Sequence, residues 1–112
     1  MDDLTKDAQE MLSVIYKEYL DRINNGISKS EAKILGSGEE LHRNFFENWL
    51  YDDFVDTMSS LAKSGYISNK WVASKIYRSI LLDKSIITME NRFSNDLNKV
   101  VDFISKIRGI AK

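Results

Sequence analysis

The sequence predicts a single, mainly α-helical domain whose helices follow the order of a helix-turn-helix motif. The 112 residues suit one domain over 1–112, which can bury a core without disulfides or bound metal. The chain has no proline and only five glycines, which argues against a turn-rich all-β fold. Three helical stretches precede residue 65, and the third runs directly into "GYI", which is the helix-turn-helix order.

The first helix is predicted over residues 4–23, where apolar residues recur at steps of three and four before "NNG" closes the run. Two capping boxes then predict further helical turns: Ser28 with Glu31, and Ser37 with Glu40. The first of these turns is expected to stop at Gly36, and the second to run through "ELHRNFFENW".

The stretch "LYDDFVDTMSSLAKSGYI", residues 50–67, predicts the second helix of the motif and the chain that leaves it. Gly65 is expected to end this helix, because glycine adopts the left-handed backbone that closes many helices. Its core face is expected to consist of Leu50, Phe54, Met58 and Leu61.

Residues 66–88 are compatible with two structures. Their apolar residues can be spaced along a helix, which periodicity alone favours and which would give an all-α helical bundle. They can equally form two short strands, about 66–73 and 76–82, that turn near Ser74. So short a run does not decide between the two.

A closing amphipathic helix is predicted over about 88–109, with Thr88 as its N-cap. "FSND" at 93–96 is expected to introduce a kink or a restart, because such side chains compete for backbone hydrogen bonds. This helix is expected either to pack on the first helix or to form a homodimer through the terminal helices.

The stretches "GISKSEAKILGS", "DDFVDTMSSLAKSGYI" and "IITMENRF" together resemble small winged-helix proteins of low-GC Gram-positive bacteria and their mobile elements, the YjcQ-like group. The resemblance covers roughly residues 11–107. It implies a winged helix-turn-helix fold, mainly α with a small antiparallel β-wing over residues 66–82. Asn91 stands where many winged-helix proteins carry a glycine, and asparagine also tolerates a left-handed backbone. The resemblance implies association with DNA. It assigns no catalytic or ligand-binding role to any residue.

The predicted second helix is acidic where a DNA-reading helix is normally basic. Its outward positions include Asp52, Asp53 and Asp56. Carboxylates repel phosphates, and major-groove readout mostly uses Arg, Lys, Asn or Gln. Asp52 and Asp53 are also explained as favourable charges at a helix N-terminus, which leaves Asp56 unexplained. We therefore expect this helix to face away from DNA, or to meet a basic protein partner.

Basic residues follow this helix and occur throughout the predicted wing: Lys63, Lys70, Lys75, Arg78 and Lys84. A basic wing can contact the phosphate backbone of duplex DNA without reading its sequence. An exposed hairpin edge also carries lysines simply to prevent aggregation, and the two interpretations have equal support.

The alternative function is a protein–protein interaction module on the same fold. The acidic residues Asp52, Asp53 and Asp56 would face the partner, together with Trp49 and Trp71 if both are exposed. If they are not exposed together, ordinary packing explains both tryptophans.

Enzyme chemistry finds little support in the sequence, and no cofactor or metal is expected. His42 is the only histidine and there is no cysteine, which excludes Cys–His pairs and multi-histidine metal sites. Asp52 and Asp56 share a helical face, but a solvated surface explains them better than a cation site. "GSG" at 36–38 lacks the Lys–Ser/Thr ending of a phosphate loop.

Composition predicts a cytoplasmic protein with an uneven charge. The start "MDDLTKDAQE" is unlike a signal peptide, and no apolar run approaches the ~20 residues of a membrane helix. Residues 1–68 carry 7 Lys and Arg against 13 Asp and Glu, whereas residues 69–112 carry 9 against 4. This asymmetry is compatible with binding of a polyanion, with head-to-tail self-association, or with two solvated faces that differ in charge without a function.

Overall fold

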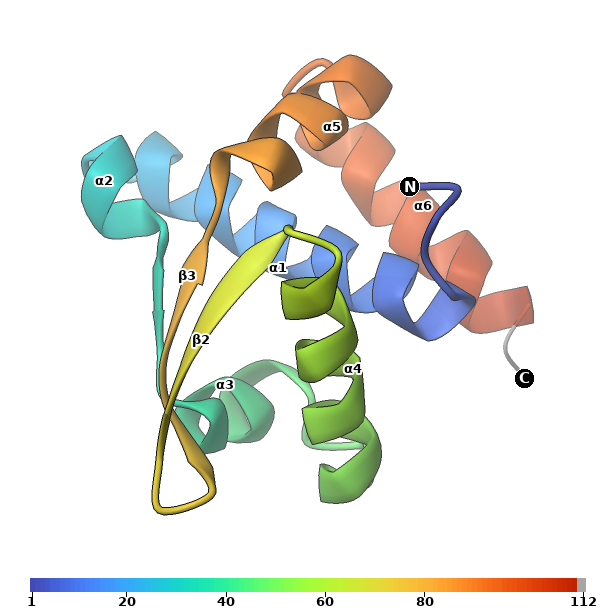
Figure 1. The fold of residues 1–112 in the computed structure, drawn as a ribbon. Coiled ribbons are helices and arrows are strands. Elements are labelled where there is room, and N and C mark those ends of the chain that lie inside the picture. The colour runs from blue at the N-terminus through green and yellow to red at the C-terminus, as the bar shows by residue number, and fades with distance from the viewer. Residues whose placement is uncertain (111–112) are drawn as a thin grey trace.

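The structure is a computed structural model that describes residues 1–110, and it is mainly helical with one small antiparallel sheet (Figure 1). In this part of the chain the elements are, in order, α1 (Lys6–Asn24), α2 (Lys29–Ala32), β1 (Ile34–Gly36), α3 (Gly38–Phe45), α4 (Tyr51–Lys63), β2 (Ile67–Val72), β3 (Lys75–Leu81), α5 (Asp83–Phe93) and α6 (Leu97–Ile110).

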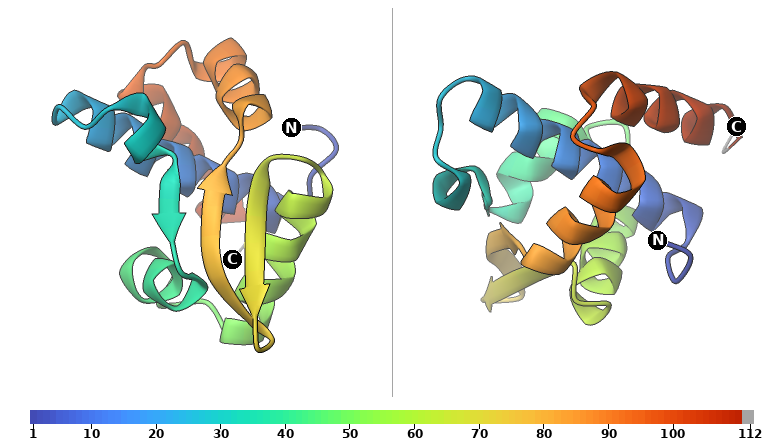
Figure 2. Two further views of the ribbon diagram at one scale, coloured as in Figure 1. Left: turned by 60° about the vertical axis from the view of Figure 1, so that its left-hand side comes forward. Right: turned by 90° about the horizontal axis from the view of Figure 1, so that it is seen from above.

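The long helix α1 forms the centre of the domain, and α6 packs along it (Figure 2). Thr5 caps α1, as its hydroxyl oxygen accepts a hydrogen bond from the Ala8 amide at 3.2 Å. The apolar stripe of α6 is buried: Val100, Ile104 and Ile107. The predicted packing of the last helix on the first is therefore confirmed, and this stripe is covered within one chain.

Residues 66–82 form the predicted β-hairpin, so the all-α helical bundle is wrong. β2 and β3 pair antiparallel from Ile67 opposite Leu81 to Val72 opposite Lys75. The turn at Ala73 and Ser74 has φ angles of 50° and 66°, the left-handed geometry of a tight two-residue hairpin turn. The apolar spacing of these residues fits both a helix and two strands. In the strands the backbone groups are satisfied by cross-strand hydrogen bonds.

A third strand, β1, was not predicted and replaces the end of the short helix that was expected from Ser28 to Gly36. Ser28 and Ser37 are confirmed as N-caps, since each hydroxyl oxygen accepts from the amide three residues on, but α2 stops at Ala32 rather than at Gly36. Ile34 pairs with Ile80 of β3, and the carbonyl of Lys33 accepts a hydrogen bond from the Leu81 amide at 2.8 Å. Pairing with β3 therefore overrides the short helix, because so few turns contribute little stability of their own.

Helix α4 has the predicted core face except at Leu50. Phe54, Met58 and Leu61 are buried, and Gly65 with φ +85° leads the chain into β2 as expected. Leu50 is 74% exposed, so its predicted burial is wrong. It is the N-cap residue with ψ 138°, and this extended backbone takes its side chain off the buried face.

The predicted helix over 88–109 is in fact two helices, α5 and α6, so Thr88 lies inside α5 and is not a cap. The restart expected from "FSND" is confirmed: Ser94 and Asn95 adopt left-handed φ angles of 51° and 59°. The predicted left-handed position, Asn91, is helical instead. The Asp96 carboxylate accepts hydrogen bonds from the amides of Asn98 and Lys99, 3.0 and 3.4 Å away, and so caps the start of α6.

Candidate nucleic-acid interface and polar cleft

The outward face of α4 is acidic, as predicted. Asp52, Asp53 and Asp56 are all exposed on it. Asp52 and Asp53 lie in the first turn, where the helix dipole stabilises a negative charge. Asp56 lies beyond that turn and gains little from the dipole, so its charge adds to an acidic surface.

On the hairpin, Lys70 and Arg78 lie directly opposite each other in neighbouring strands. Both are exposed, on the sheet face opposite the one that carries the buried Ser79. Within residues 1–110 neither makes an ion pair. Two adjacent cations without a counterion leave net positive charge on this face.

Two of the other predicted basic residues are already engaged. Lys75 pairs with Glu39 at 2.9 Å, and this hydrogen bond raises the pKa of Lys75 and lowers the pKa of Glu39. Lys84 donates to the Ser64 carbonyl at 2.6 Å and lies 4.5 Å above the ring of Tyr66. Both side chains remain partly exposed, but their charges are partly compensated.

The five predicted basic residues therefore do not form one equivalent strip. Lys70 and Arg78 occupy the middle of the hairpin, and Lys75 lies near its tip. Lys63 and Lys84 lie at the opposite end, where α4 passes into β2. Lys63 is exposed and, in the described part of the chain, has no ion pair.

The hairpin is fixed to α4 by a short polar relay. The buried Ser79 hydroxyl donates to the side-chain oxygen of Asn69 at 2.6 Å. The Asn69 amide in turn donates to the carbonyl of Met58 in α4 at 3.1 Å. This relay sets the position of the hairpin relative to the acidic helix.

Exposed apolar side chains gather at one end of the domain. Trp71, Val72 and Tyr77 lie near the hairpin tip, and Leu50 and Tyr51 at the start of α4. Figure 1 shows the tip of the hairpin and the start of α4 at the same end of the molecule. A shift in strand register between Lys70 and Trp71 marks the distal part of the hairpin.

The two tryptophans are not exposed together. Trp71 is 45% exposed, whereas Trp49 is half-buried with its ring against Phe46 at 5.4 Å. The condition that would have placed both in one protein interface is therefore not met. The exposure of Leu50 was not predicted, because its apolar character and spacing predicted burial.

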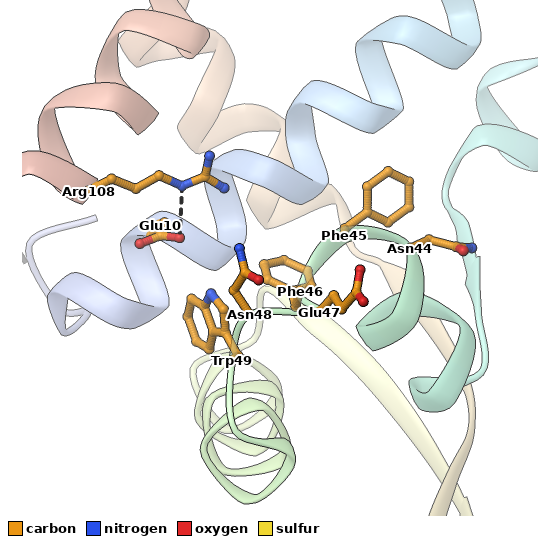
Figure 3. A pocket seen from close by; sticks show the side chains of 8 residues that line it. All are labelled: Glu10, Asn44, Phe45, Phe46, Glu47, Asn48, Trp49 and Arg108. Carbon is orange, nitrogen blue, oxygen red and sulfur yellow. Dashed lines mark hydrogen bonds and ion pairs between the residues drawn. The ribbon is translucent and has the colours of Figure 1, made fainter.

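A polar cleft of about 540 Å³ lies between α1, the end of α6 and the segment that joins α3 to α4 (Figure 3). It is lined by Glu10, Asn44, Phe45, Phe46, Glu47, Asn48, Trp49 and Arg108. Sequence reasoning did not find this cleft, because its residues come from three distant parts of the chain and form no local motif.

The cleft is anchored on both sides. Glu10 is only 7% exposed, and its Oε2 lies 3.2 Å from Nε of Arg108. On the other side the Trp49 amide donates to the Phe46 carbonyl at 2.9 Å, and the Trp49 carbonyl lies 2.8 Å from Nε2 of His42. These contacts hold the aromatic and charged walls in place.

His42 has a packing role. Its ring contacts Tyr51 and Phe54 at centroid distances of 5.2 and 5.1 Å. Residues 1–110 contain no group of three or more His, Cys, Asp or Glu arranged to hold a metal ion. No helix in the same residues is long and apolar enough to cross a membrane.

Comparisons with models of known protein families, with curated proteins and with solved structures each found no match to this chain.

Proposed function

We propose that this chain is a cytoplasmic winged-helix protein that associates with duplex DNA through the β2–β3 hairpin, as a small transcriptional regulator or mobile-element accessory protein. The helix order, with α4 leading directly into an antiparallel hairpin, is compatible with a winged-helix layout. The observation that carries the proposal is the pair Lys70 and Arg78, which places uncompensated positive charge on an exposed sheet face.

In this proposal the hairpin contacts phosphates, and α4 does not read bases. Lys63, Lys70 and Arg78 supply the contacts, because Lys75 and Lys84 already interact with other groups. Each phosphate neutralised lowers the slope of log affinity against log salt by about 0.9, so three contacts give a slope of about −2.7. The exposed rings of Trp71 and Tyr77 would lie beside the duplex, where apolar side chains can enter a minor groove.

The test is the affinity for a labelled duplex, measured by fluorescence anisotropy over a range of salt concentrations. The variant Lys70→Glu with Arg78→Glu is expected to abolish binding at moderate salt, because it replaces two phosphate contacts with repulsion. The matched control, Lys6→Glu with Lys29→Glu, changes net charge equally at exposed positions outside the hairpin. Equal losses in both variants, or no binding of the unmodified protein at low ionic strength, would reject the proposal.

A protein-interaction module is the second candidate, and the exposed apolar end of the domain favours it. Leu50 and Tyr51 are exposed beside Asp52 and Asp53, which suits a partner that is both apolar and basic. Replacing Leu50, which is 74% exposed, by serine should weaken binding of such a partner strongly and change DNA affinity little. The two candidates are thus separable on the same protein.

A homodimer through the terminal helices is also a proposal. Because Val100, Ile104 and Ile107 are covered within one chain, such a dimer would have to use the outer faces of α1 and α6, where Val101 is exposed. Sedimentation equilibrium decides it, and a mass equal to one chain at micromolar concentration would remove it.

A further inference from the structure

The polar cleft presents hydrogen-bonding groups that the fold does not use. Arg108 is 53% exposed, and within residues 1–110 its two terminal nitrogens make no hydrogen bond, as only Nε contacts Glu10. The side-chain amide of Asn48 likewise makes none with the described residues. Figure 3 shows Arg108, Glu10, Asn48 and Trp49 together at one end of the cleft.

The geometry of Arg108 suits a carboxylate. Its Nε–H donates to Glu10 at 3.2 Å, and the edge formed by its two terminal NH2 groups makes no hydrogen bond with the described residues. A planar guanidinium with free N–H groups binds carboxylates in a bidentate manner, which a flexible ammonium group cannot do.

Glu10 supplies an acceptor beside that donor. In the described residues, no buried side-chain oxygen or nitrogen lacks a hydrogen-bond partner. Within residues 1–110 only Oε2 of Glu10 makes a hydrogen bond, so Oε1 keeps some exposure to solvent at this cleft-lining residue. An open carboxylate oxygen next to a free guanidinium edge presents opposite charges to a ligand within one small site.

The balance of charge selects the class of ligand. Glu10 and Glu47 contribute two negative charges to the cleft and Arg108 one positive charge, so a simple anion would meet net repulsion. A ligand with both an ammonium and a carboxylate group satisfies both signs. The ring of Trp49, held against Phe46, offers an apolar surface beside these charges.

We propose that this cleft binds a free amino acid with an apolar or aromatic side chain. The carboxylate contacts Arg108 and Asn48, the ammonium contacts Oε1 of Glu10, and the side chain packs on Trp49. The cleft volume of about 540 Å³ lies in the range of about 300–1,000 Å³ typical of small-ligand sites. The site is separate from the hairpin and does not depend on DNA binding.

The test is a titration of the full chain with L-phenylalanine, followed by ¹H–¹⁵N NMR. Saturable shifts are expected for the amides of residues 44–49 and for Arg108. Two matched probes each remove one charge: L-phenylalaninamide lacks the carboxylate, and N-acetyl-L-phenylalanine lacks the ammonium. Both should bind roughly tenfold to a hundredfold more weakly, as expected when a charged hydrogen bond is lost.

The variant Arg108→Gln should show the same loss for L-phenylalanine, whereas Lys106→Gln, an exposed cation on the same helix, should bind as the unmodified protein does. The spectrum itself reports whether each variant is folded, and the probe series needs no variant. Shifts that are absent, that are spread over other surfaces, or that are equal for the three probes would overturn the proposal.

Discussion

Replacing Asn69 by alanine should loosen the hairpin from α4, because Asn69 joins the two. Its side-chain oxygen accepts from Ser79 at 2.6 Å and its amide donates to the Met58 carbonyl at 3.1 Å. The Ser79 hydroxyl is fully buried, so it loses its acceptor at a cost of roughly 1–3 kcal/mol. Loss of the bond to Met58 adds about 1 kcal/mol. The total is about 2–4 kcal/mol, and at roughly 4–8 °C for each kcal/mol the melting temperature should fall by about 8–30 °C.

The variant Ser79→Ala alone should lower the free energy of unfolding by about 1 kcal/mol, which is less than the effect of Asn69→Ala. The reason is that Asn69 is half-buried, so water can reach the side-chain oxygen that Ser79 leaves without a donor. In the Asn69→Ala background the same change removes an unsatisfied hydroxyl and should cost almost nothing. A double-mutant cycle by urea unfolding measures this coupling, expected at about 1 kcal/mol. The control Ser68→Ala, on the exposed face of the same strand, should stay within about 0.5 kcal/mol. Additive effects at Asn69 and Ser79 would refute the relay.

Three further predictions concern stability. Burial raises the pKa of Tyr16 from 10.0 to about 12. The contribution of Tyr16 to the free energy of unfolding is therefore fully present below pH 10 and is lost as the pH rises toward 12. In urea unfolding, Tyr16→Phe should flatten this decline of stability with pH. Gly65→Ala should cost about 1 kcal/mol at φ +85°, whereas Gly109→Ala, in a helix with open space around it, should stabilise slightly, as thermal melts would show. Leu50→Ala should change stability by less than about 0.5 kcal/mol, but Phe54→Ala should cost about 3–5 kcal/mol; equal losses would contradict the exposure of Leu50.

Much of the helical part of the fold could be predicted, because its signals are local. The N-caps at Ser28 and Ser37 and the glycine at residue 65 each act within one turn, and all three appear in the structure. Strand β1 could not be predicted, since its three residues are ordered by pairing with β3, more than forty residues away. Leu50 was misplaced because helical periodicity does not report where the first turn begins.

In the candidate sites, too, features set by local sequence could be predicted and features set by tertiary contacts could not. Charge patterns along the sequence identified the acidic face of α4 and the cations Lys70 and Arg78, but ion pairing to Glu39 depends on tertiary contacts. The polar cleft depends on α1 and α6 lying side by side, which brings Glu10 to Arg108 across 98 residues. No local spacing in the sequence carries that information.

The salt dependence of duplex DNA binding tests the central claim most directly. The unmodified protein should bind at low ionic strength with a slope of log affinity against log salt of about −2.7. Replacing Lys70 and Arg78 by glutamine should reduce this slope by about 1.8, while Lys6 and Lys29 replaced by glutamine should leave it unchanged. A slope that is the same in both variants, or no binding at any salt concentration, would contradict the assignment of the hairpin as the DNA-contacting surface.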